Sequence, residues 1–152
     1  MEEEDFLDCL KAVSRDNART PMQWDDSENA GFTTGTPWLK VNENYHMINA
    51  KAALADKNSV FYYYQKLIQL RKSYDVIIDG VFVGLLEDNN DIYAYERRLG
   101  DQRLLVACNF TSNEVPCELF QDVSGEELIS NYKCHKDGVL KPYEARVVLI
   151  GK

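Results

Sequence analysis

The spacing of apolar positions changes near Tyr74. Before that residue, apolar side chains recur at the three- and four-residue intervals of a helix, and after it they alternate or form short β-branched runs. This change predicts two parts, residues 1–75 and residues 76–152. We expect the first part to be helical and rich in loops, and the second to be an all-β domain.

Three segments of the first part have the features of helices. Residues 3–13 carry apolar side chains at positions i, i+4 and i+7, after an acidic first turn. Asn49 is a good N-cap for the alanine-rich residues 50–56. The strongest pattern, SVFYYYQKLIQLRKSY over residues 59–74, starts with a second capping residue, Ser59.

The helix predicted over residues 59–74 has a broad apolar face. Its central stripe consists of Val60, Phe61, Tyr64, Leu67 and Ile68. A face of this width on a small domain needs a large surface to pack against. If no such surface is provided, we expect the chain to self-associate through this helix and the N-terminal arm.

The second part has the pattern of an antiparallel sheet protein. Short apolar or alternating runs are separated by polar turn groups such as EDNND, LGDQ and TSNE. The predicted strands cover residues 76–86, 91–99, 102–110, 115–120, 126–132 and 141–150. Six to eight strands with short turns are typical of a sandwich, so the fold class is expected to be mainly β.

Charge and composition exclude some classes of function. The net charge of −8 leaves no basic face for a nucleic acid. No apolar run is long enough to span a membrane, and MEEED is unlike a secretory leader, so a cytoplasmic location is expected. The scattered cysteines indicate free thiols, and two histidines are too few for a metal site. We expect neither a metal nor a cofactor. The four cysteines are Cys9, Cys108, Cys117 and Cys134.

The most distinctive stretch is SRDNARTPMQWDDSENAGF, residues 14–32. It is too polar for a core strand and too irregular for a helix. RDNARTPMQWD, residues 15–25, resembles a loop of the α-glucosidase branch of the α-amylase family, which includes oligo-1,6-glucosidases, dextran glucosidases, trehalose-6-phosphate hydrolases and isomaltulose synthases. Matching residues continue through NAGF, PW, VN, NY and IN, through the helix at residues 59–74, and to PYEA at residues 142–145, so the resemblance covers essentially the whole chain.

The resemblance implies a fold and a function. Members of this family have a (β/α)8 catalytic barrel followed by a C-terminal antiparallel β-sandwich. The helical arm would correspond to the end of the barrel, and the β-domain to the sandwich. The chain would then be the C-terminal part of an α-glucosidase that hydrolyses α-glucosidic bonds of short oligosaccharides. Neither the particular α-glucoside nor the choice between hydrolysis and isomerisation is determined by these residues.

The resemblance also assigns a substrate-binding group. A retaining glycosidase needs two carboxylates about 5 Å apart, and the family motifs that carry them do not occur here, so we predict no catalytic residue and no activity for the chain alone. An arginine of the loop binds glucose hydroxyls in the family. We assign that role to Arg19, with Arg15 as the second choice and a structural salt bridge of Arg19 as the alternative. Asp16 and Asn17 are expected to hold the loop's shape.

Two further functions remain open. One is a free-standing carbohydrate-binding module, for which two or three aromatic side chains should line up on an exposed sheet face. The other is a structural β-sandwich module related to transporter ectodomains. The aromatic rings of the loop region are expected to be buried anchors instead of sugar platforms. These are Trp24, Phe32 and Trp38.

Overall fold

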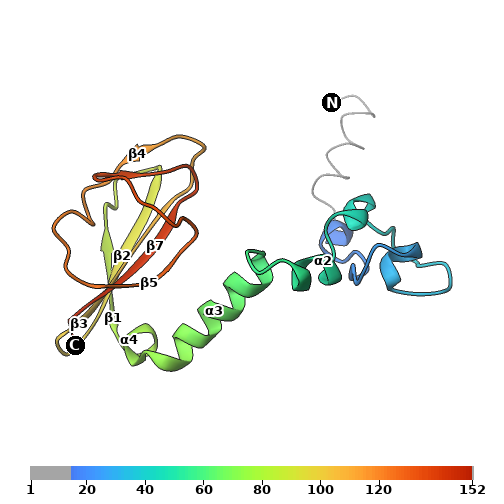
Figure 1. The fold of residues 1–152 in the computed structure, drawn as a ribbon, viewed down its shortest axis with the longest axis horizontal. Coiled ribbons are helices and arrows are strands. Elements are labelled where there is room, and N and C mark those ends of the chain that lie inside the picture. Colours follow the sequence, from blue (N-terminus) through green and yellow to red (C-terminus); the bar gives the residue numbers. More distant parts are fainter. Residues whose placement is uncertain (1–14, 152) are drawn as a thin grey trace. The chain divides into compact units, whose positions relative to one another are not determined.

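The computed structural model of the chain describes residues 15–151, and its contacts separate into two units, Met1–Tyr63 and Tyr64–Lys152 (Figure 1). The helix predicted over residues 3–13 lies outside the described residues. The boundary between the two units, after Tyr63, lies within the helix Val60–Ser73. It therefore does not test the predicted division into domains 1–75 and 76–152. Each unit is described by itself below.

The first unit consists of loops joined by short helices. Asn49 caps one of them as predicted, because its Oδ1 accepts the backbone N–H of Ala52 at 2.8 Å. Its Nδ2 donates to the carbonyl of Tyr45 at 2.8 Å, so the same side chain also holds the preceding turn. The elements are η1 (Arg15–Ala18), η2 (Glu28–Gly31), η3 (Glu43–His46) and α2 (Ala50–Ala55).

The helix predicted over residues 59–74 is confirmed as α3 (Val60–Ser73). The next residues correct the prediction, because Val76 and its neighbours form a short helix, α4 (Asp75–Ile78), instead of the start of a strand. The Arg97 guanidinium donates to the carbonyls of Val76 and Ile78 at 3.3 and 3.1 Å and so satisfies the end of α4. No helix within residues 15–151 is long and apolar enough to cross a membrane.

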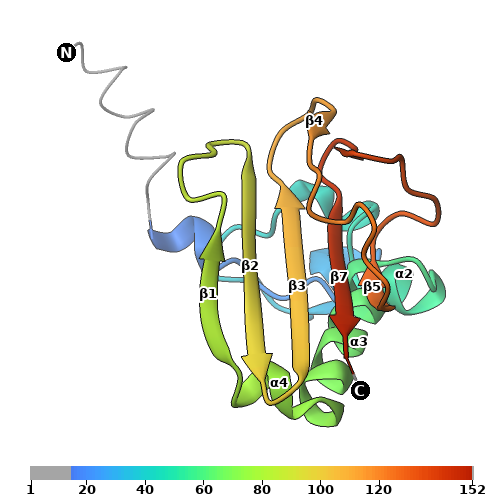
Figure 2. The ribbon, with the colours of Figure 1, turned by 90° about the vertical axis from the view of Figure 1, so that its left-hand side faces the viewer.

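Five antiparallel strands form the main sheet of the second unit. Figure 2 shows them in the order β1-β2-β3-β7-β5. A second, two-stranded sheet pairs β4 with β6. The strands are β1 (Val81–Leu85), β2 (Ile92–Leu99), β3 (Gln102–Asn109), β4 (Val115–Pro116), β5 (Glu126–Ser130), β6 (Val139–Leu140) and β7 (Ala145–Ile150).

The predicted mainly β fold with an antiparallel sandwich is confirmed, with shorter strands than expected. Residues 117–120 leave the sheet after β4, residues 141–144 form a turn before β7, and β6 was not predicted. A core lies between the two sheets, and Leu85, Leu119 and Phe120 pack against it. Its buried members are Ile92, Ala94, Ala107, Val115, Cys117 and Leu140.

Two buried carboxylates stabilise this unit. Glu96 is 4% exposed and forms ion pairs with Arg98 at 2.6 Å and Arg103 at 3.2 Å. The Glu144 side chain is 1% exposed, and it contacts the His135 Nδ1 at 2.5 Å and accepts the backbone N–H of Lys141 at 2.8 Å. A buried charge costs several kcal/mol unless it is paired in this way.

Candidate functional site

The loop that carries the predicted binding arginine starts with a turn. Residues 15–18 form η1, and the backbone N–H of Arg19 donates to the carbonyl of Asp16 at 3.0 Å. The Arg19 side chain is exposed. Within residues 15–151 no ion pair involves its guanidinium, so the described structure gives no support to the structural alternative. The side chain of Arg15 lies outside what the structure describes.

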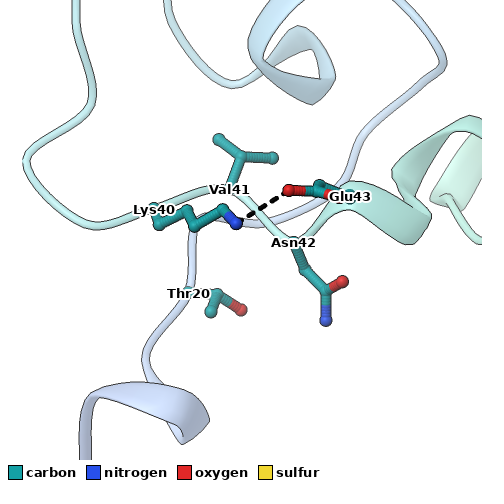
Figure 3. A pocket seen from close by; sticks show the side chains of 5 residues that line it. All are labelled: Thr20, Lys40, Val41, Asn42 and Glu43. Carbon is teal, nitrogen blue, oxygen red and sulfur yellow. Dashed lines mark hydrogen bonds and ion pairs between the residues drawn. The ribbon is translucent and has the colours of Figure 1, made fainter. Parts of the chain in front are cut away.

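A polar hollow of about 450 Å³ adjoins this turn (Figure 3). Thr20 contributes a hydroxyl from the loop, and Asn42 contributes an amide from the segment before η3. The Lys40 Nζ lies 2.7 Å from the Glu43 Oε1, which keeps that carboxyl ionised by lowering its pKa through a hydrogen bond and charge attraction. Hydroxyl, amide and charged groups around a shallow hollow suit the hydroxyls of a sugar.

The glutamine of the loop joins it to the residues that follow. The Gln23 Nε2 donates to the Asn44 Oδ1 at 2.9 Å and to the carbonyl of Ile48 at 2.5 Å. The carbonyl of Gln23 accepts the backbone N–H of Ala50 at 2.9 Å, at the start of α2. The glutamine therefore fixes where the polar hollow and α2 lie relative to the loop.

A tight reversal follows the tryptophan. The backbone N–H groups of Trp24 and Asp25 both donate to the carbonyl of Ala30, at 2.9 and 3.2 Å. Asn29, Ala30 and Gly31 all have positive φ, at 52°, 58° and 65°. At Gly31, where φ is +65°, a Cβ would lie 2.7 Å from the Asp25 Oδ1, so a larger residue would be strained and would displace that carboxylate. The sequence NAGF thus encodes a turn rather than a binding group.

Two of the loop's three aspartates, Asp25 and Asp26, are charged groups that hold its shape. The Ser27 hydroxyl and backbone N–H both donate to Asp25, which lowers the pKa of that carboxyl. The Asp26 pKa is lowered too, chiefly by the hydrogen bond from Lys51 at 3.1 Å. A glycosidase acid needs a raised pKa, so neither aspartate suits that role.

The aromatic rings of this region are exposed, which contradicts our expectation of buried anchors. The exposed fractions are 54% for Trp24, 48% for Phe32 and 93% for Trp38. Trp24 holds the loop through its backbone instead, since its carbonyl accepts the N–H of Lys51 at 3.0 Å. Its ring borders an apolar hollow of about 550 Å³ that Met22, Leu54 and other residues also line.

Arg19 is not among the described residues that line the polar hollow, although Thr20, which follows it directly, is one of them. The residues from Lys40 to Glu43 were not predicted to lie there. The dipeptides VN (residues 41–42) and NY (residues 44–45) match the family pattern, and this match is the sequence signal that could have pointed to these residues. Among residues 15–151 no group of three potential ligands could hold a metal ion. The described cysteines, Cys108, Cys117 and Cys134, are free thiols as predicted.

Comparison with known families divides the chain at the start of its sheet. Residues 1–80 match the family described as "Alpha amylase, catalytic domain". Residues 82–147 match the family described as "Maltogenic Amylase, C-terminal domain". The first match includes the loop, α2, α3 and α4, and the second includes most of the sandwich.

Individual relatives match over the whole chain but only part of their own length. The oligo-1,6-glucosidase of Parageobacillus thermoglucosidasius is 50% identical over 97% of this chain. The crystal structure of Bacillus licheniformis trehalose-6-phosphate hydrolase matches all of it, with a TM-score of 0.92 and 43% identity. The isomaltulose synthase of Klebsiella sp. LX3 matches 98%, with a TM-score of 0.89 and 37% identity. This chain spans 28–29% of the length of these proteins.

Proposed function

Because the chain belongs to the α-amylase family, we propose that it is the C-terminal part of an α-glucosidase of the oligo-1,6-glucosidase type. The observation that carries this proposal is the pairing of the two family matches: the end of a catalytic domain, residues 1–80, is followed directly by its C-terminal domain, residues 82–147. The substrate class is short oligosaccharides with α-glucosidic bonds.

In this proposal the chain contributes binding groups and structural support, while the catalytic carboxylates come from the remaining length of the enzyme. Three described acidic groups, two from the loop and one from the polar hollow, favour this division of roles. Asp25, Asp26 and Glu43 each have a lowered pKa because of a hydrogen-bonding partner. They are ionised acceptors at neutral pH and not proton donors to a leaving group.

Arg19 supplies the hydrogen bonds to the glucose hydroxyls in this proposal. A guanidinium offers five donors in a fixed geometry and stays charged. Arg19 is exposed, and the next residue in the sequence, Thr20, lines the polar hollow, which supports this role. Arg15 is the second candidate from the same loop. The cytoplasmic location is part of the proposal as well, and the three free thiols support it because reducing compartments preserve thiols.

A chimeric enzyme tests the proposal. This chain replaces the matching region of the Parageobacillus thermoglucosidasius oligo-1,6-glucosidase, to which it is 50% identical. We expect the chimera to hydrolyse isomaltose. A folded chimera that has no activity on isomaltose, maltose or trehalose 6-phosphate would contradict the proposed function.

Variants of the same chimera assign the arginine. Arg19→Ala should reduce kcat/KM about 10–100-fold, the effect of losing charged hydrogen bonds worth about 1.5–3 kcal/mol. Arg71→Ala, which changes an exposed arginine of α3, is the matched control and should leave kcat/KM unchanged. If Arg15→Ala has the large effect and Arg19→Ala does not, the role belongs to Arg15.

A further inference from the structure

A histidine joins the segment between β5 and β7 to the strands on either side of it. This segment, residues 131–144, leaves the main sheet after β5, contributes β6 to the second sheet and returns as β7 (Figure 2). The His135 Nε2 lies 2.8 Å from the Glu127 Oε2 of β5, and its Nδ1 lies 2.5 Å from the Glu144 Oε1. We call these three side chains the histidine cluster. Their exposed fractions are 19% for His135, 34% for Glu127 and 1% for Glu144.

The two contacts of the ring require a proton on each of its nitrogens. An ionised carboxylate only accepts hydrogen bonds, and a neutral imidazole has one N–H. Both carboxylates already act as acceptors, since Arg146 donates to Glu127 at 2.8 Å and the backbone N–H of Lys141 donates to Glu144 at 2.8 Å. In a neutral ring, the lone pair of one nitrogen would face a carboxylate oxygen at hydrogen-bond distance. The closed cluster therefore holds an imidazolium.

The charges around the ring balance only when the ring is protonated. Glu127 and Glu144 supply the negative charges, while the imidazolium and Arg146 of β7, which keeps its proton, supply the positive ones. The Cys117 thiol stays uncharged, because burial raises its pKa and the charge of Glu144 adds to this effect. Loss of the ring proton leaves an unbalanced negative charge in a buried site, which strongly destabilises the structure around it.

The lysines of the same segment are engaged elsewhere. The Lys141 Nζ donates to the carbonyl of Cys134 at 2.5 Å and lies 5.0 Å from the centre of the Tyr132 ring. The Lys136 Nζ lies 2.6 Å from the Glu114 Oε2. The imidazole is therefore the positive group of this cluster whose charge changes near neutral pH.

The segment that the histidine cluster holds covers part of the sandwich core. Leu140 of β6 is 2% exposed and pairs with Val115 of β4. The backbone N–H of Cys117 donates to the carbonyl of Gly138 at 2.8 Å. Val115, Cys117 and Leu140 all belong to the buried core. Opening of the segment would therefore break the second sheet and uncover the core beneath it.

We propose that protonation of His135 closes residues 131–144 over the core, and that loss of this proton releases the segment. A histidine in water has a pKa of about 6.5. Below that pH the open and closed forms both hold the proton, so closure keeps its full stability. Above it, closure requires the uptake of one proton, and its equilibrium constant falls by up to about tenfold for each pH unit. The stability of the closed segment is therefore lost as the pH rises, and this device requires no other part of the enzyme.

Amide hydrogen exchange of the purified chain, measured by NMR at about pH 6 and about pH 8.5, on either side of the ordinary histidine value, tests the proposal. Protection factors, which compare each amide with an unstructured chain, remove the intrinsic effect of pH. The Cys117 N–H should lose protection about tenfold or more at the higher pH. It should remain less protected than the N–H of Leu105, which is 2% exposed in the centre of the main sheet, since only the segment opens.

Three variants assign the effect to the ring. His135→Gln has no proton to lose, so protection of Cys117 should be the same at both pH values. His46→Gln is the matched control, because it changes the exposed histidine outside the sandwich, and it should keep the dependence on pH. The amide introduced by Glu127→Gln can donate to a neutral ring, so this variant should keep the segment closed at the higher pH. It tests the proposal even if His135→Gln does not fold.

The nitrogen-15 chemical shifts of the imidazole provide a direct readout. At neutral pH both ring nitrogens of His135 should have the shifts of protonated nitrogen. A neutral ring under these conditions overturns the proposal, and so does protection of Cys117 that does not change with pH. Equal protection of Cys117 and Leu105 would mean that the whole sandwich unfolds instead of the segment alone. A dependence on pH that persists in His135→Gln would place the proton on another group.

Discussion

At the scale of single residues, the polar side chains of the distinctive loop bind one another and the residues that follow the loop. Asp25 accepts two hydrogen bonds from Ser27, Asp26 pairs with Lys51, and Gln23 binds Asn44. Side chains such as Asp, Ser and Asn readily hydrogen-bond groups close to them in the sequence and so hold a loop that forms no helix or strand. These polar residues are therefore explained by the local structure, and Arg19 is not used in these contacts.

Replacing Ser27 tests the state of Asp25. Ser27→Ala removes the hydroxyl donor, the largest cause of the lowered pKa of Asp25, so that pKa should rise towards its ordinary value of 3.8. Because the pKa of Asp25 is lowered in the folded state, its contribution to stability is present above pH 3.8 and is lost as the pH falls through the lowered value. NMR titration of the carboxyl carbons measures the change. The pKa of Asp26, which depends on Lys51, should stay low, and an unchanged pKa of Asp25 would contradict the assignment.

Removing the Glu144 carboxylate should weaken the sandwich strongly. Its side chain is 1% exposed and accepts from the backbone of Lys141, and its partner His135 also lies 2.8 Å from Glu127. Glu144→Ala leaves the His135 Nδ1 and the backbone N–H of Lys141 without this partner, which should lower the free energy of unfolding by about 3–5 kcal/mol. Urea denaturation measures the loss. The exposed Glu126→Ala should change stability by less than about 0.5 kcal/mol, and a comparable loss in both variants would mean that burial of the pair does not matter.

At the scale of elements, α3 carries an apolar stripe whose side chains remain exposed to solvent. Leu70 is the buried apolar residue among its described side chains. The stripe is exposed, with fractions of 83% for Val60, 45% for Phe61, 63% for Tyr64, 38% for Leu67 and 43% for Ile68. Helical stability in proteins comes mainly from packing an amphipathic face, so this stripe calls for a partner surface.

The isolated chain should therefore self-associate through α3. Burial of several hundred Å² of the stripe is worth several kcal/mol at about 25 cal/mol per Å², before the cost of association. Sedimentation over a range of concentrations measures the state, and Leu67→Lys with Ile68→Lys should shift it to monomer. The matched control, Gln65→Lys with Gln69→Lys, adds the same charge at exposed polar positions and should leave association intact. A monomer at all concentrations would contradict this prediction.

At the scale of the whole molecule, the chain holds a sandwich and the end of a catalytic domain. A retaining glycosidase needs a nucleophile and a proton donor on either side of the scissile bond, about 5–5.5 Å apart. Asp25, Asp26, Glu96 and Glu144 are engaged in loop and sheet contacts instead. Sugar binding by one arginine without pocket walls buries little ligand surface.

The purified chain should accordingly leave isomaltose, maltose and p-nitrophenyl α-glucoside uncleaved. The chimera under the same conditions is the positive control. Release of glucose by the isolated chain, abolished by replacing one of its own carboxylates, would show that a catalytic pair is present and has been missed.

The sequence by itself determined the parts of this protein that depend on local or repeating patterns. Helical spacing predicted α3, the capping side chain of Asn49 predicted α2, and alternation predicted β2 and β3. The RDNARTPMQW pattern predicted the family, because a long polar pattern is specific without any knowledge of contacts.

Tertiary structure decided what depends on distant partners. Three of the four residues 75–78 are β-branched, yet the segment forms α4, and Arg97 of another element binds the carbonyls of Val76 and Ile78. The pairing of β4 with β6 joins segments more than twenty residues apart, and neither segment has the length of a recognisable strand. The exposure of Trp24 was likewise invisible in the sequence, because an aromatic residue in a polar loop has the same letter whether or not a neighbour covers it.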